Sequence, residues 1–305
     1  MLEAAVFLCG AVIMVIELAG SRVLAPFLGT SLAVWTSLIG IILAAMSLGA
    51  WWGGRLADRR PEPRLLSRII LLAGACTAAM ALTKGLALSF LQHQGAGLYA
   101  LAVAAALVLF APPALLLGMV APFAVRLRLN DPAHGGRVAG TLYALSSLGS
   151  IAGTFLAGFV LIATVGSTNI LLLMAVTLAL AALLADRSGL RLKLLAAGVF
   201  LLLLLLTQAR DEALARAGFL DTDTPYNRVI VHLSAEEDSG RPTRVMITGP
   251  GAQQSAMYLD DPAALALPYT RFYRLAEHFA PDLRRMLVLG GGGYSFPKFA
   301  LARYP

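Results

Sequence analysis

The sequence is poor in charged residues for its length. Only 13% of its 305 residues are Asp, Glu, Lys or Arg, whereas 58% are hydrophobic and the mean hydropathy is +0.77. Soluble globular domains carry about 25% charged residues. This composition therefore excludes an ordinary soluble domain and predicts a membrane protein.

Cysteine and histidine are also scarce, with two and four residues respectively. Cys9 and Cys76 both lie inside apolar runs, and neither has a second cysteine or a histidine at the spacing of a metal site. Without such spacing, neither a disulfide framework nor a metal centre is expected.

Basic residues exceed acidic ones, which gives a formal charge of +7. They gather in short connections between apolar runs, and the alternate connections lack them. This pattern indicates helix orientation in a membrane, not nucleic-acid binding, and it places the N-terminus in the cytoplasm. The basic connections contain Arg55, Arg59, Arg60, Arg64, Arg68, Arg126, Arg128, Arg137, Arg187, Arg191 and Lys193.

The apolar runs predict a multi-pass α-helical membrane domain over residues 1–207. A helix needs about 20 apolar residues to cross a bilayer, and the lipid bilayer is thus the expected surrounding. About seven runs are long enough, at residues 4–25, 31–53, 65–91, 97–125, 141–164, 168–185 and 191–207.

Two short motifs recur in this domain, which suggests an internal repeat. The first is Ala-Pro-Phe at residues 25–27 and 121–123, and the second is Ser-Leu-Gly at 47–49 and 147–149. A unit of three helices would enter the membrane from opposite sides in its two copies, as in the inverted 3+3 repeats of many transporters. The Gly49–Gly53 and Gly149–Gly153 pairs also have the spacing of close helix packing in lipid.

Few ionisable residues lie within the predicted spans, and those of interest are Glu17, Arg22 and Lys84. A charge in a membrane helix is costly and needs a partner or a polar cavity. One interpretation is an internal ion pair, with Lys84 reaching toward the interface. The other is that Glu17 binds a cation, for which a polyamine would be suitable.

After about residue 208 the composition changes and apolar residues alternate. Strands are expected at 226–233 and 243–248, and an amphipathic helix at 265–279. Met286–Leu289 reads as a strand that runs into four glycines and a helix start, an arrangement that brings backbone N–H groups close to a nucleotide. We therefore expect a small β-rich part at residues 208–280, followed by the start of a Rossmann-like α/β domain at 281–305.

The order of these pieces resembles the spermidine synthase family of aminopropyltransferases, and most closely its membrane-anchored bacterial branch. The resemblance covers essentially the whole chain, and four motifs carry it: TPYNRVIV at 224–231, QQS at 253–255, YTR at 269–271 and LVLGGGGYS at 287–295. It implies a membrane-integral aminopropyltransferase of polyamine biosynthesis in a bacterial-type inner membrane. The co-substrates would be decarboxylated S-adenosylmethionine and a putrescine-like amine, without a metal; homo-oligomer formation is left open.

Carried over by position, the resemblance assigns ligand contacts but no catalytic residue. Gly290, Gly291, Gly292 and Gly293 would approach the adenosylmethionine-type ligand. The pockets for ligand and amine would be lined by Tyr226, Gln254 and Tyr269.

The chain departs from the family pattern at several positions. Gly293 replaces an Asp that the soluble enzymes usually have in the turn, and Thr270 and Arg271 replace a His-Glu pair. The acidic residues expected for the ribose and for the amine proton would lie beyond Pro305. We therefore expect a truncated member that is inactive in this form. Two alternatives stay open, a polyamine or small-cation transporter and an S-adenosylmethionine-dependent methyltransferase relative.

Overall fold

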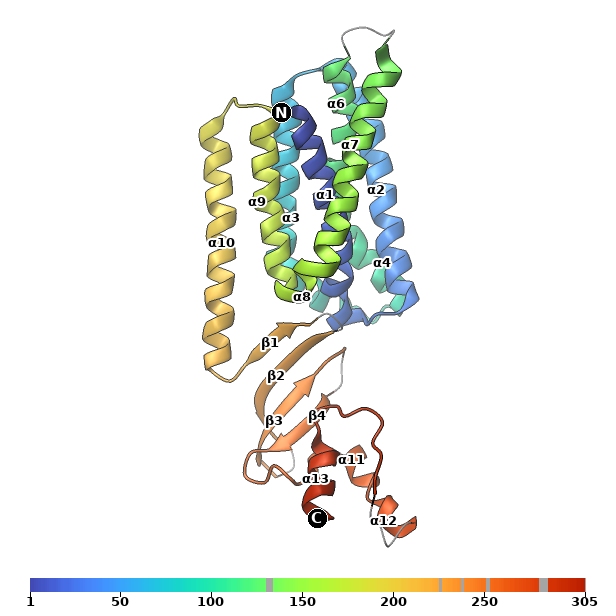
Figure 1. Cartoon of the computed structure of the whole chain (residues 1–305), viewed down its shortest axis with the longest axis vertical. Coiled ribbons are helices and arrows are strands. Elements are labelled where there is room, and N and C mark those ends of the chain that lie inside the picture. The colour runs from blue at the N-terminus through green and yellow to red at the C-terminus, as the bar shows by residue number, and fades with distance from the viewer. Residues whose placement is uncertain (130–133, 225–226, 237–238, 251–252, 280–284, 305) are drawn as a thin grey trace. The chain divides into compact units, whose positions relative to one another are not determined.

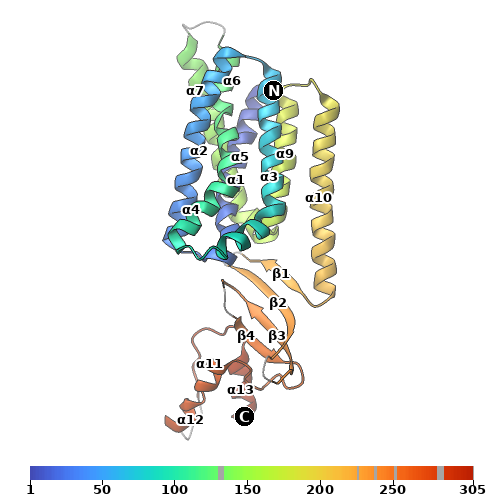
Figure 2. The same cartoon turned by 180° about the vertical axis from the view of Figure 1, so that it is seen from behind.

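The computed structural model forms two compact units (Figures 1 and 2). One unit comprises residues 1–209 with 223–225, and the other comprises 210–222 with 226–305. The structure describes residues 1–129, 134–224, 227–236, 239–250, 253–279 and 285–304.

The first unit is a helix bundle. Among the described residues, six helices are long and apolar enough to cross a membrane, so the chain is a multi-pass membrane protein by length and composition. They are α1 (Leu2–Leu28), α2 (Leu32–Arg59), α3 (Pro63–Gln92), α7 with the short η2 and α8 that continue it (Gly135–Leu156, Ala157–Leu161, Ile162–Thr164), α9 (Ser167–Ala185) and α10 (Leu190–Arg216).

The run predicted as a span at 97–125 is broken. It forms α4 (Leu98–Leu109), α5 (Ala111–Gly118) and α6 (Val120–Arg128), with a bend of 51° between α4 and the part that follows. Pro112 and Pro113 stand at the start of α5. Proline has no N–H and its ring displaces the carbonyl four residues earlier, which breaks a helix at this point. Counting the bent segment as one crossing gives up to seven spans.

The core of the bundle lies around α1, which packs against α7 and α9; α3 also packs on α9 and α2 on α5. The largest fully buried side chains come from five helices and the α4–α5 break, for example Ile16, Leu38, Ile70, Phe110 and Leu171. In contrast, α10 lies on the outside of the bundle (Figure 1) and buries only Lys193 and Phe200 among its described residues. Its exposed leucines match a lipid-facing helix.

Contacts within this unit identify its two ends. At one end the Arg128 guanidinium contacts Glu3, and Arg187 Nη2 lies 3.7 Å from Met1 Sδ. Ser167, at the far end of α9 from Arg187, donates its backbone N–H to Asp223 Oδ2 at 2.6 Å. Met1 and Asp223 therefore belong to opposite ends of the helix bundle.

The second unit contains an antiparallel sheet in the order β1-β2-β3-β4. The strands predicted at 226–233 and 243–248 are confirmed with small shifts as β2 (Arg228–Ala235) and β3 (Pro242–Ile247). The other two strands, β1 (Leu220–Asp223) and β4 (Gln253–Tyr258), are additional to the sequence prediction. The predicted helix 265–279 forms as two short helices, α11 (Pro268–Phe272) and α12 (Leu275–Phe279).

The predicted strand Met286–Leu289 is wrong for this structure, although the helix after the glycines is present as α13 (Ser295–Arg303). Leu287 and Leu289 are 85% and 88% exposed. A strand is stabilised by ladder hydrogen bonds and by a buried face. Residues 286–289 pair with no strand of the described chain. The described residues therefore form an antiparallel sheet, and the expected Rossmann-like part is not shown among them.

Candidate functional site

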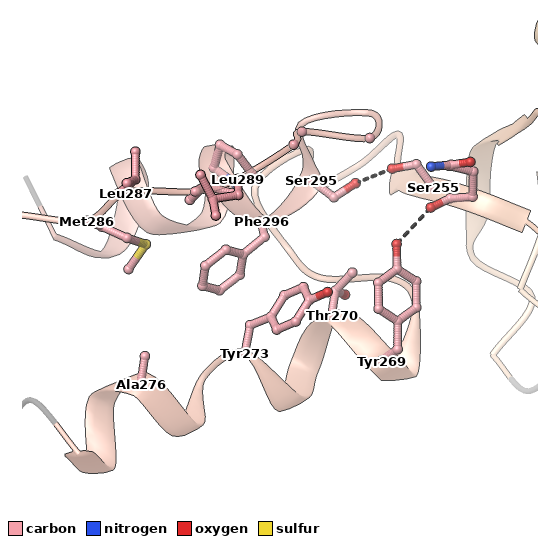
Figure 3. Close-up of a pocket in the computed structure, with 16 residues that line it drawn as sticks. Ser255, Tyr269, Thr270, Tyr273, Ala276, Met286, Leu287, Leu289, Ser295 and Phe296 are labelled. Atoms are coloured by element: carbon pink, nitrogen blue, oxygen red, sulfur yellow. Dashed lines mark hydrogen bonds between the residues drawn. The ribbon is translucent and has the colours of Figure 1, made fainter. Parts of the chain in front are cut away.

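A cavity of about 700 Å³ lies in the second unit and is its candidate site (Figure 3). Its walls come from the start of β4, from α11 and α12, and from the glycine turn with the start of α13. Three of the predicted ligand-binding segments thus meet in one place. The lining residues used below are Gln254, Ser255, Tyr269, Thr270, Tyr273, Gly290, Gly291, Gly292, Ser295 and Phe296.

The glycine turn, Gly290–Gly293, has a backbone conformation that residues with a side chain rarely adopt. Gly290 and Gly292 have φ angles of +78° and +51°, and nothing lies within 4 Å of the position where a Cβ would stand. Tyr294 is also left-handed, with φ of 58°. Because glycine adopts positive φ at no steric cost, the turn can present bare backbone to the cavity.

Two buried serines fix this turn on β4. Ser255 Oγ and Ser295 Oγ are 2.9 Å apart, and Ser295 Oγ donates to the carbonyl oxygen of Ala256 at 3.0 Å. A Cβ on Gly293 would stand 2.6 Å from Ser255 Oγ. Gly293 therefore packs on the strand and is not among the residues that line the cavity, unlike the three glycines before it.

Aromatic rings form another part of the lining. The Tyr273 and Phe296 rings point toward one another and are in edge-to-face contact (Figure 3), with ring centroids 5.1 Å apart at 69°. Tyr269 meets Tyr273 edge-on at 6.0 Å. Such edge-to-face pairs are favourable and present both ring faces and ring edges.

Gln254 and Tyr269, both predicted as ligand contacts, are joined by a hydrogen bond that involves the Gln254 backbone and not its side chain. The Tyr269 hydroxyl donates to the backbone carbonyl of Gln254 at 2.7 Å. The Gln254 side-chain oxygen accepts a hydrogen bond from Thr248. The remaining predicted contact, Tyr226, lies outside the described residues.

Arg271, at the end of the YTR motif, contacts acidic and phenolic side chains of the sheet. Its Nη2 lies 3.4 Å from Glu236 Oε1, whose other contact is the Tyr258 hydroxyl at 2.7 Å. Hydrogen bonds from Ser239 and Tyr258 and the charge of Arg271 hold the pKa of Glu236 below its usual value. These residues do not line the cavity.

The polar residues predicted within the spans, Glu17, Arg22 and Lys84, have contacts that differ from the predicted ion pair. Lys84 Nζ donates to Ser167 Oγ at 3.1 Å, and Arg22 lines a small cavity together with Ser167 and Asp223. Glu17 is half-buried and makes no hydrogen bond or ion pair with any described residue. The ion pair considered from the sequence is thus not formed.

Sequence reasoning missed several of these residues. Ser255 and Ser295 belong to the motifs of the resemblance, yet a serine on a strand or in a turn gives no sign of whether it packs or binds. Asp223 stands outside every predicted span, so its contact with Ser167 was not foreseeable from hydropathy. Tyr273 and Phe296 read as ordinary apolar positions of short helices.

Within the described ranges, no three or more His, Cys, Asp or Glu side chains are grouped as metal ligands would be. In comparisons with known proteins, no family model, curated protein or solved structure matches the chain.

Proposed function

We propose that the second unit binds the nucleoside part of an adenosylmethionine-type ligand, as the ligand-binding part of a membrane-integral aminopropyltransferase. One observation supports this best. Gln254, Tyr269 and the Gly290–Gly292 turn are far apart in the sequence but line one cavity. The co-substrates would be decarboxylated S-adenosylmethionine and a putrescine-like amine.

The chemistry of the lining suits such a ligand. A cavity of about 700 Å³ lies in the range of small-molecule sites, which are mostly apolar with a few polar groups. Its described lining contains no charged side chain. Hydroxyl and amide groups and turn N–H groups can serve adenine and ribose, while Tyr273 and Phe296 offer ring faces that attract a sulfonium cation.

The first test is equilibrium binding to the full chain in detergent, with 5′-methylthioadenosine, decarboxylated S-adenosylmethionine and S-adenosylmethionine as ligands. We expect micromolar binding of the first two. The Tyr273→Ala variant should weaken the binding of decarboxylated S-adenosylmethionine, a sulfonium cation, by about fivefold to thirtyfold. This is the equivalent of about 1–2 kcal/mol for one ring. The binding of 5′-methylthioadenosine, a neutral thioether, should be weakened less.

The matched control is Phe272→Ala, because Phe272 is the neighbouring aromatic residue but is exposed and does not line the cavity. Equal losses in both variants, or no binding at all, would remove the proposal. Preference for S-adenosylmethionine over its decarboxylated form would favour a methyltransferase relative instead.

A second function, transport of a small cation by the helix bundle, is supported by two matching sets of glycine contacts. Gly49 and Gly53 of α2 are in close contact with Leu115 and Met119. In the same way, Gly149 and Gly153 of α7 are in close contact with Phe7 and Ala11. The glycines of α2 thus pack on the bent helix α4–α6, and those of α7 pack on α1. An inverted 3+3 repeat predicts this exchange, because the first helix of each repeat then packs on the second helix of the other. The Ala-Pro-Phe motifs do not share this register, since Pro122 follows Gly118 by 4 residues and Pro26 follows its counterpart Gly10 by 16.

In this alternative Glu17 is the cation-binding group, because a half-buried carboxylate within a span is rarely retained without a role. Uptake of radiolabelled putrescine into proteoliposomes tests it. The Glu17→Gln variant should lose uptake at least tenfold, whereas ligand binding by the second unit should not change. Unchanged uptake, or none in the original chain, would rule out transport of this amine.

A further inference from the structure

We infer that the helix bundle binds one acyl chain of a membrane lipid in a cavity between α1, α2, α5, α6 and α7. The cavity has a volume of about 300 Å³. It is separate from the site in the second unit, and the inference does not depend on either proposed function. The residues that carry the argument are Cys9, Gly10, Met46, Ser47, Gly118 and Ser146.

The walls of this cavity are fixed by two backbone contacts. A Cβ on Gly10 would stand 2.3 Å from the carbonyl oxygen of Ser146, and one on Gly118 would stand 2.4 Å from that of Met46. All four residues line the cavity. Because both helix pairs are already at their closest approach, they cannot move together to fill the space between them.

The position of the cavity is significant. Gly10–Ser146 joins α1 to α7, and Gly118–Met46 joins the bent helix to α2, so the cavity lies between two equivalent helix pairs. In secondary transporters built from inverted repeats, substrate sites lie at the interface between the repeats. The matching contacts of the two helix pairs therefore favour this place as a ligand site.

The chemistry of the lining selects a neutral, mainly apolar ligand. No charged residue or histidine is among its described lining residues, and the polar groups are Cys9, Ser47, Tyr143 and Ser146. The Ser47 hydroxyl already donates to the carbonyl oxygen of Leu43 at 2.8 Å. A polyamine would bring two or more charges into a site without a counter-charge, which is strongly unfavourable.

Exposed lining residues lie on α2 and α7, so we expect the occupant to enter from the bilayer between these two helices. The rim of the cavity contains Leu43 and Tyr143, which are 56% and 68% exposed, and also the exposed Ala50. In the 18-residue apolar segment of α2, only 28% of the residues are buried within the protein. The corresponding share is 22% for α7 with its continuation to Thr164, so both helices present apolar surface to lipid. The space holds roughly ten water-sized groups, which matches a segment of an acyl chain.

Native mass spectrometry of the full chain, purified in mild detergent and given 1-palmitoyl-2-oleoyl-phosphatidylglycerol, tests the inference. We expect one retained lipid for the original chain and at least a fivefold lower retained fraction for Ala50→Phe, whose ring would fill the cavity. Ala44→Phe is the matched control, since Ala44 is also exposed on α2 but does not line the cavity. Equal retention in both variants would overturn the inference.

Cys9 supplies a second measurement that needs no change in the cavity. It is a buried thiol on the cavity wall, and Cys76 is the other cysteine of the chain. In a Cys76→Ala background, the phospholipid should slow N-ethylmaleimide labelling of Cys9 at least fivefold, and putrescine should have no effect. Protection by putrescine, or none by the lipid, would contradict the assignment.

Discussion

The two units use glycine for opposite reasons. In the helix bundle, a Cβ on Gly49 or Gly149 would stand 2.0 Å from a carbonyl oxygen of the neighbouring helix. In the second unit, Gly290 and Gly292 have open space around them, but their φ angles are positive. Gly49 and Gly149 are required because there is no room for a side chain between the helices. Gly290 and Gly292 are required because their backbone conformation is unfavourable for other residues.

This difference shows how each unit is stabilised. The bundle gains stability from close backbone contact over long helices, so each contact is surrounded by many others. The glycine turn has few neighbours, and its conformation depends on its own dihedral angles and on Ser255 and Ser295. Substitutions should therefore act through sterics in one unit and through backbone strain in the other.

The largest expected effect is that of Gly149→Ala. Its methyl group cannot be accommodated unless α7 moves away from α1, and overpacking of this kind costs about 1–3 kcal/mol or more. Thermal unfolding in detergent micelles should show a clearly lower midpoint.

Gly140→Ala is its control on the same helix, because nothing lies within 4 Å of that Cβ position. It should be neutral or stabilising by up to about 1 kcal/mol, since alanine favours helix more than glycine does. If the two variants unfolded at the same temperature, steric contact would not be the reason for Gly149.

Hydropathy predicted most of the membrane part because each span is long and apolar throughout. It could not predict the break at Phe110, since a proline pair in a long apolar run bends some helices and ends others. Met286–Leu289 failed for a different reason. An apolar run of four residues has strand character only when another strand pairs with it, and that partner is not encoded within the run.

The candidate site could be predicted in part. The resemblance and the glycine pattern led to the turn, to Gln254 and to Tyr269, which meet in one cavity. The serine pair and the Tyr273–Phe296 wall depend on how β4 and α13 pack, which is tertiary information. In the bundle, the distinction between Gly10, which borders a cavity, and Gly140, which is open, is likewise set by neighbours from distant segments.

The smaller expected effect is that of Gly290→Ala, which tests backbone freedom without a steric contact. Left-handed backbone costs an alanine about 1–2 kcal/mol, and asparagine tolerates it better. Hydrogen exchange followed by mass spectrometry should show faster exchange at residues 294–299 for Gly290→Ala than for Gly290→Asn. Gly291→Ala should change little, because its φ is not positive and its nearest neighbour is the exposed Tyr294 ring. If Gly290→Asn were as damaging as Gly290→Ala, side-chain volume and not the dihedral angle would control the turn, and the contrast between the two units would be lost.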